Sequence, residues 1–162
     1  MSQQGLPKVV ALPKKGDARP IAFSANRRLD LDEVLAILLN EGAIAEADVK
    51  RVRGAARHSG RSEIHPLVVV ANAKLEHQGH PGEVLSLEWL TEWVARHAGL
   101  PHLHIDPTKV DVNAVGQVVT AQYATRYRIL PLAIDDVTLT VATSEPFDTR
   151  WIDDIRQLTR RE

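Results

Sequence analysis

The sequence contains no cysteine, which excludes disulfide bonds, thiolate metal sites and cysteine nucleophiles together. It also lacks a long apolar run, because a run such as residues 66–71 is far shorter than the ~20 residues that a membrane-spanning helix needs. Its first 25 residues hold no apolar stretch of signal-peptide length. We therefore expect a cytoplasmic protein that does not insert directly into a membrane.

An excess of charge of either sign is also missing, since 20 basic and 21 acidic side chains give a formal net charge of −1. With such a balance the protein has no strong electrostatic attraction for the negatively charged nucleic acids, so no nucleic-acid partner is expected. The chain does have 162 residues, of which 44% are hydrophobic. That is enough to bury a core in one globular domain or in two small ones.

Composition and periodicity divide the chain into three parts. Residues 1–27 contain three prolines and five basic side chains between brief apolar pieces, which predicts a flexible N-terminal tail. Residues 28–100 follow a helical period and predict a helical subdomain. Residues 101–162 change to a mixed pattern and predict a small α/β domain.

The helical subdomain has clear start and stop signals. Ser86 is a typical N-cap, and Gly42 and Gly99 are placed to end helices in the left-handed conformation. The segment 64–71 stays open between a strand and a helix, because its three consecutive valines favour a strand while Pro66 suits the first turn of a helix. The predicted helices cover residues 31–41, 45–60 and 87–98.

The C-terminal part predicts a small sheet with helices. Residues 102–105 alternate like a strand. The turn Asp135-Asp136 separates two further apolar segments, as in a two-residue hairpin. The expected order is a strand at 102–105, one broken or two short helices within 111–127, strands at 129–134 and 137–142, and a last helix from about residue 148. The fold class is therefore α+β: an N-terminal helical subdomain followed by a small three-stranded βααββα domain.

Five short pieces in a fixed order resemble a known family over residues 90–155. They are residues 97–103, 105–107, 127–132, 139–142 and 146–148. Together they are similar to the N-terminal domain of the type II secretion and type IV pilus assembly ATPases, the general secretory pathway protein E family. Residues 28–100 are similar to the helical subdomain that precedes this domain in the same ATPases.

The resemblance implies a docking and regulatory role. In the family this region couples a homohexameric motor to the cytoplasmic domain of an inner-membrane platform protein in protein secretion or pilus assembly. The chain has no Gly-x-x-x-x-Gly-Lys-[Ser/Thr] loop, so it lacks the cradle and lysine that a nucleoside triphosphate needs. We expect no catalytic residue here, and we expect ATP and Mg²⁺ in the parent motor domain, with the protein peripheral to the inner membrane through its partners.

An alternative function is a cyclic di-GMP sensor of the same family with a degenerate motif. Some relatives bind this ligand through two copies of a motif in which an arginine meets phosphate and glycines permit close backbone approach. Here Glu33 stands at the arginine position of the first copy, and a histidine stands at the glutamine position of the second. The candidate ligand-binding residues are Leu38, Leu39, Gly42, Ile44 and His97.

The predicted second helix carries a dense basic run, which is either a solvated helix face or a contact with an acidic partner or phosphate. The candidate partner-binding residues are Arg51, Arg53 and Arg57. Trp89 and Trp93 lie at i and i+4 on one helix face, where they pack in a core or line a ligand pocket. No metal site is expected, because His102 and His104 have no third ligand at a defined spacing.

Overall fold

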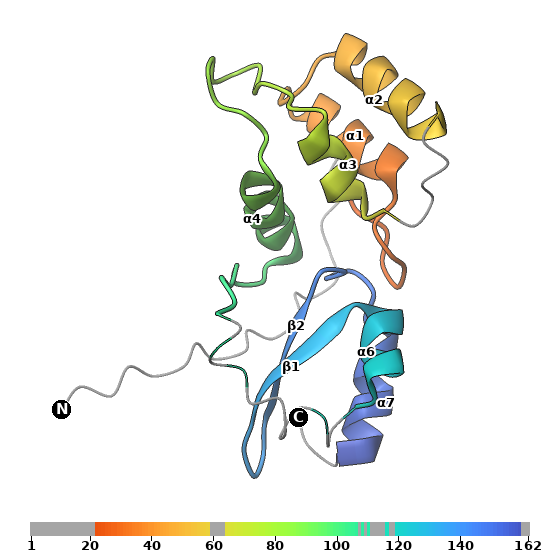
Figure 1. Ribbon diagram of the computed structural model, residues 1–162, viewed down its shortest axis with the longest axis vertical. Coiled ribbons are helices and arrows are strands. Elements are labelled where there is room, and N and C mark those ends of the chain that lie inside the picture. Colours follow the sequence, from red (N-terminus) through yellow and green to blue (C-terminus); the bar gives the residue numbers. More distant parts are fainter. Residues whose placement is uncertain are drawn as a thin grey trace, which may run out of the picture.

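The computed structural model describes residues 22–58, 64–106, 108, 110, 116 and 119–159. Within them the fold is α+β, as predicted: four helices come first, and a helix, a two-stranded sheet and a last helix follow (Figure 1). The elements are α1 (Leu31–Asn40), α2 (Glu46–His58), α3 (Pro66–Asn72), α4 (Leu87–Ala98), α6 (Ala121–Tyr127), β1 (Ile129–Ile134), β2 (Leu139–Thr143) and α7 (Arg150–Thr159).

Local capping sets the ends of the predicted helices. The Asp30 carboxylate accepts hydrogen bonds from the first-turn backbone N–H groups of α1, and the Ser86 hydroxyl accepts one from Trp89 N. Gly42 and Gly99, at φ of 71° and 66°, follow α1 and α4 in the left-handed conformation that ends a helix. The segment left open between strand and helix is the helix α3, whose N-cap is His65 and whose first residue is proline.

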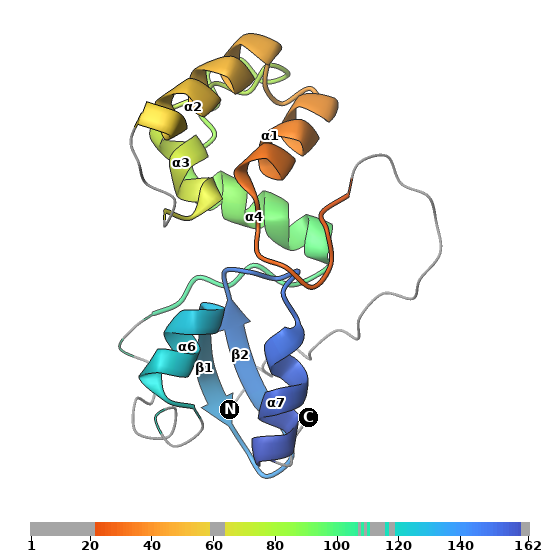
Figure 2. The ribbon, with the colours of Figure 1, turned by 90° about the vertical axis from the view of Figure 1, so that its right-hand side faces the viewer.

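The four helices of the N-terminal half enclose one apolar core. Leu35, Leu38, Val70, Leu85 and Leu90 are fully buried in it. Helix α1 contributes most of its apolar face to this core, and α2, α3 and α4 pack around the same core (Figure 2). Because this burial removes several large aliphatic side chains from water, the core supplies the main stabilisation of this half.

The C-terminal half is a hairpin covered by two helices. Strands β1 and β2 pair antiparallel from Ile129 opposite Thr143 to Ile134 opposite Leu139, with an irregularity between Pro131 and Ala133. Both views place α6 and α7 on the same face of this sheet (Figures 1 and 2). Ile129, Leu139 and Ile155 form the small core between them.

Two predictions for this half are wrong in detail. Residues 102–105 form no strand, so the sheet of the described residues has two strands rather than three. The reason is visible at His102, whose ring nitrogen lies 3.2 Å from Thr91 Oγ1 of α4, a contact that holds this segment near the helix. The hairpin loop spans residues 135–138 rather than two residues, because the Asp135 carboxylate accepts hydrogen bonds from both Val137 N and Thr138 N.

Parts of the remaining predictions lie outside the described residues. These are residues 1–21 of the predicted tail, residues 59–60 of the second helix and most of 107–118. The described end of the predicted tail, residues 22–27, packs against both halves of the protein. Within the described ranges, no helix has the length and apolar character needed to cross a membrane.

Candidate functional site

A cavity of about 670 Å³ lies between the end of α1, the loop before α4 and α4 itself. Its walls combine indole rings, imidazoles and charged groups from segments that are far apart in the sequence. The lining residues are Glu41, Ala43, His77, His80, Glu83, Trp89, Trp93, Arg96 and His97. This cavity is therefore the candidate functional site of the helical half.

Helix α4 supplies the aromatic wall. Trp89, Trp93 and His97 follow one another at intervals of four residues, so they lie on one face of the helix. The two indole rings are stacked with centroids 6.3 Å apart, and the His97 ring meets Trp93 edge-on at 4.9 Å. Trp93 is buried whereas Trp89 is partly exposed, so Trp89 presents the accessible π surface of this wall.

Glu41 ties the end of α1 to this wall. One oxygen of its carboxylate accepts a hydrogen bond from Trp93 Nε1 at 2.8 Å, and the other lies 2.9 Å from His97 Nε2. The left-handed Gly42 turns the chain directly after this residue, which directs Ala43 to the same cavity. The carboxylate therefore orients two cavity side chains.

The loop between α3 and α4 forms the opposite rim. Its position is fixed by Gln78 N, which donates a hydrogen bond to Ala43 O at 2.9 Å. The rings of His77 and His80 lie 4.5 Å apart, and His80 Nδ1 lies 3.6 Å from a carboxylate oxygen of Glu83. No group of three or more potential metal ligands is assembled anywhere in the described ranges. With Arg96 also on the wall, the cavity suits a planar polar ligand with an anionic group.

The structure separates the predicted ligand-binding residues. His97 lines the cavity. Leu38 and Ile44 are buried in the core and Leu39 is partly buried, so these three support the turn rather than contact the cavity. Gly42 forms that turn at φ 71°. Binding of a ligand by this set stays a prediction.

The predicted partner-binding arginines lie on the solvent side of α2. Val49 and Val52 bury the opposite side of the helix in the core. The Arg51 guanidinium pairs with Asp48 at 2.9 Å and that of Arg53 pairs with Asp32 at 2.6 Å, while Arg57 is exposed. Exposed ion pairs of this kind contribute little to stability. Binding of a partner by the three arginines stays a prediction.

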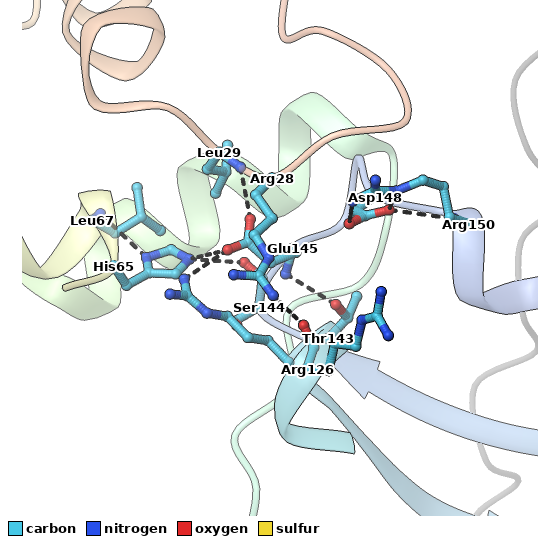
Figure 3. A network of polar contacts seen from close by, with 11 residues as sticks. Arg28, Leu29, His65, Leu67, Arg126, Thr143, Ser144, Glu145, Asp148 and Arg150 are labelled. Atoms are coloured by element: carbon cyan, nitrogen blue, oxygen red, sulfur yellow. Dashed lines mark hydrogen bonds and ion pairs between the residues drawn. The ribbon is translucent and has the colours of Figure 1, made fainter. Parts of the chain in front are cut away.

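A polar junction connects the two halves at some distance from α2. The Glu145 carboxylate is completely buried and accepts hydrogen bonds from Leu29 N and Arg128 Nη1, each at 2.7 Å (Figure 3). His65 approaches the same carboxylate at 3.5 Å, and its Nε2 lies 3.1 Å from Ser144 O. Burial lowers the pKa of His65 below its ordinary value, and the Glu145 carboxylate only partly opposes this.

Asp148 is the second buried carboxylate near the junction. It accepts two hydrogen bonds from the Arg150 guanidinium, at 2.7 and 2.6 Å (Figure 3). These bonds hold the pKa of Asp148 below its usual value. Both buried carboxylates are therefore engaged in positioning the loop between β2 and α7.

Sequence reasoning missed Glu41, Arg96 and the buried Glu145 as members of these sites. Glu41 carries no local signal, because a carboxylate at a helix end is normally solvated. The stacked pair Trp89 and Trp93 was detectable from its helical spacing, and the structure shows that it serves both core and cavity.

Three comparisons show which known proteins the chain is similar to. Residues 98–162 match the model of the MshEN domain. The type IV pilus assembly ATPase TfpB of Acinetobacter baylyi (strain ATCC 33305 / BD413 / ADP1) is 30% identical over 127 residues, which are 78% of this chain and 22% of that relative. A solved structure of MshE with cdg covers 82% of this chain and 84% of that chain, at a TM-score of 0.49 and 20% identity. The chain thus spans about a fifth of the length of the curated relative.

Proposed function

Residues 98–162 form an MshEN domain, and on this basis we propose that the chain is the N-terminal docking and regulatory part of a secretion or pilus-assembly ATPase. The observation that carries the proposal is the alignment with the pilus assembly ATPase. It extends over 127 residues, more than the domain match alone spans, so it also includes part of the helical half.

The proposed work of this part is mechanical coupling. The parent motor, a homohexamer that uses ATP and Mg²⁺, binds through it to the cytoplasmic domain of an inner-membrane platform protein. The protein then acts at the cytoplasmic side of the inner membrane through its partners. The arrangement of α2 supports such a role, because its inner side is held in the core while its arginines face solvent. A rigid helix that presents cations gives a surface for an acidic partner.

The contact surface is tested by reversing charges on α2. In a pull-down with the cytoplasmic domain of the platform protein, we expect the full-length Arg53→Glu/Arg57→Glu variant to lose most of its binding. Lys74→Glu/Arg126→Glu is the matched control, because it changes the net charge equally at exposed positions outside α2 and outside the cavity. Unchanged binding of the α2 variant, at an unchanged melting temperature, would remove this helix from the interface.

The cavity favours a second function, the sensing of cyclic di-GMP. A guanine base can stack on the partly exposed indole of Trp89, and Arg96 supplies a cation for a phosphate. Calorimetric titration of the protein with cyclic di-GMP tests this proposal. We expect a heat of binding that gives a dissociation constant in the micromolar range. This heat should be lost in Arg96→Glu and His97→Ala and kept in Lys74→Glu. Absence of heat in the unmodified protein would exclude this ligand.

A further inference from the structure

The segment of residues 22–29, which precedes α1, runs between the two halves of the protein. In Figure 2 it descends from α1 to the loop that joins β2 and α7. We call this segment the strap. It contacts α4, which belongs to the helical half, and the loop at 144–149, which belongs to the C-terminal half.

Phe23 is the aromatic contact of the strap. Its ring stacks on Phe147 with centroids 4.6 Å apart and an interplanar angle of 21°. On its other sides it meets Trp93 and His97 edge-on, each at 5.5 Å. Trp93 and His97 both line the cavity, so one phenyl ring lies between the cavity wall and the C-terminal half.

Polar bonds hold the rest of the strap on the same loop. Asn26 N donates to Phe147 O at 2.8 Å, and Thr149 Oγ1 donates to the Asn26 side-chain oxygen at 2.8 Å. The Arg28 guanidinium donates to the carbonyl of Arg126 at the end of α6. These bonds come from nearby residues of the strap and tie it to the loop and to α6.

The buried carboxylate of Glu145 anchors the end of the strap. It accepts the backbone N–H of Leu29 while it pairs with Arg128, which follows α6 (Figure 3). A buried carboxylate that loses a hydrogen-bond donor is strongly destabilised. Release of the strap is therefore coupled to the position of the loop between β2 and α7.

We propose that the strap links the cavity wall to the C-terminal half, with Phe23 as the contact at the cavity and Glu145 as the anchor at the loop. A change at Trp93 or His97 then alters the packing of Phe23 on Phe147, and a shift of the loop alters the cavity in return. Coupling of this kind is reciprocal by thermodynamic necessity. The proposal deepens the regulatory role proposed above, since it supplies a route between the two halves.

Tryptophan fluorescence of the ligand-free protein tests the link. In a Trp151→Phe background the emission comes from Trp89 and Trp93 alone, because the chain has three tryptophans. We expect Glu145→Gln to raise acrylamide quenching of this emission and to shift it to the red. Asp154→Asn is the matched control: it removes a carboxylate charge in the same half, at the residue that accepts a hydrogen bond from Tyr123, without touching the strap, and should change neither signal.

A double-mutant comparison shows whether Phe23 carries the effect. Phe23→Ala alone should raise quenching, and adding Glu145→Gln to it should produce no further rise. If Glu145→Gln fails to fold, Thr149→Val replaces it, because this variant removes only one strap bond. Quenching equal to that of the Asp154→Asn control, or full additivity with Phe23→Ala, would overturn the proposal. Since the measurement uses neither a nucleotide nor a partner protein, its failure would leave the docking proposal standing.

Discussion

The backbone N–H of Leu29 donates a 2.7 Å hydrogen bond to the carboxylate of Glu145, which lies 116 residues later in the chain. Leu29 lies just before α1 in the helical half and Glu145 follows the hairpin, so the bond joins the two halves. Because Glu145 is fully buried, the junction depends on a charged group that is paired with Arg128.

Removing the charge of Glu145 should destabilise the whole protein. Glu145→Gln leaves the Arg128 guanidinium without its buried ionic partner, and we expect a loss of about 3 kcal/mol in the free energy of unfolding. Urea unfolding followed by circular dichroism measures it. Glu83→Gln, at an exposed rim position, serves as the control and should stay within about 0.5 kcal/mol of the unmodified protein. Equal stability of the two variants would show that the junction does not hold the halves together.

The same junction predicts a dependence of stability on pH. Burial lowers the pKa of His65 in the folded protein, so below the ordinary value of 6.5 the unfolded chain binds a proton before the folded one does. Stability should therefore fall as the pH drops from 6.5 to the folded pKa, and should be unaffected by this group above that range. Urea unfolding at about pH 7.5 and about pH 5.5 measures the difference.

His65→Asn should reduce this pH dependence while an asparagine oxygen still caps α3. The control Ser86→Ala removes the N-cap of α4 instead, and it should cost about 1 kcal/mol equally at both pH values. An unchanged pH dependence in His65→Asn would mean that another group is responsible.

Replacement of Leu38 tests whether its side chain is part of the core or is available to contact a ligand. It is fully buried beneath the turn at the end of α1, so Leu38→Ala should lower the free energy of unfolding by about 3 kcal/mol through the cavity that it leaves. The control Leu158→Ala removes a side chain that is 71% exposed and should change stability by less than about 0.5 kcal/mol. Thermal and urea unfolding give both values. A small effect at Leu38 would contradict its place in the core.

Substitution by alanine should have opposite effects on stability at two glycines. Gly42 has φ of 71°, a conformation that costs an alanine about 1 kcal/mol, so Gly42→Ala should destabilise the protein. Gly54 lies inside α2, and a Cβ there would meet no atom within 4 Å. Gly54→Ala should thus stabilise the protein by about 0.8 kcal/mol through helix propensity. Melting temperatures of the two variants measure the signs, and a gain in stability for Gly42→Ala would refute the left-handed turn.

Local signals allowed much of the helical half to be predicted from the sequence. The Ser86 cap and the glycines after α1 and α4 act within one helical turn, and the structure confirms these positions. The resemblance to a pilus assembly ATPase is also confirmed, through the similarity of 127 residues to such an ATPase and the match of residues 98–162 to the MshEN domain. Interactions between residues close in the sequence, together with the order of the short motifs, were sufficient to predict these features.

The junction and the cavity depend on contacts between distant residues, which no local pattern reveals. Glu145 lies in a loop between β2 and α7, where a carboxylate would ordinarily be solvated, and its partner Leu29 belongs to another half. Glu41 likewise acquires its role only when α4 packs against the end of α1. The alternation at residues 102–105 was misleading, because alternation alone does not provide a neighbouring strand.

Site-specific cross-linking in cells tests the docking role most directly. A photoreactive side chain is placed at position 57 on α2 of the full-length protein, and at position 74 after α3 as the control, since both positions are exposed. Our account predicts a cross-linked product with the inner-membrane platform protein from position 57 and none from position 74. A platform product that is absent from position 57, or equally abundant from both positions, would contradict it.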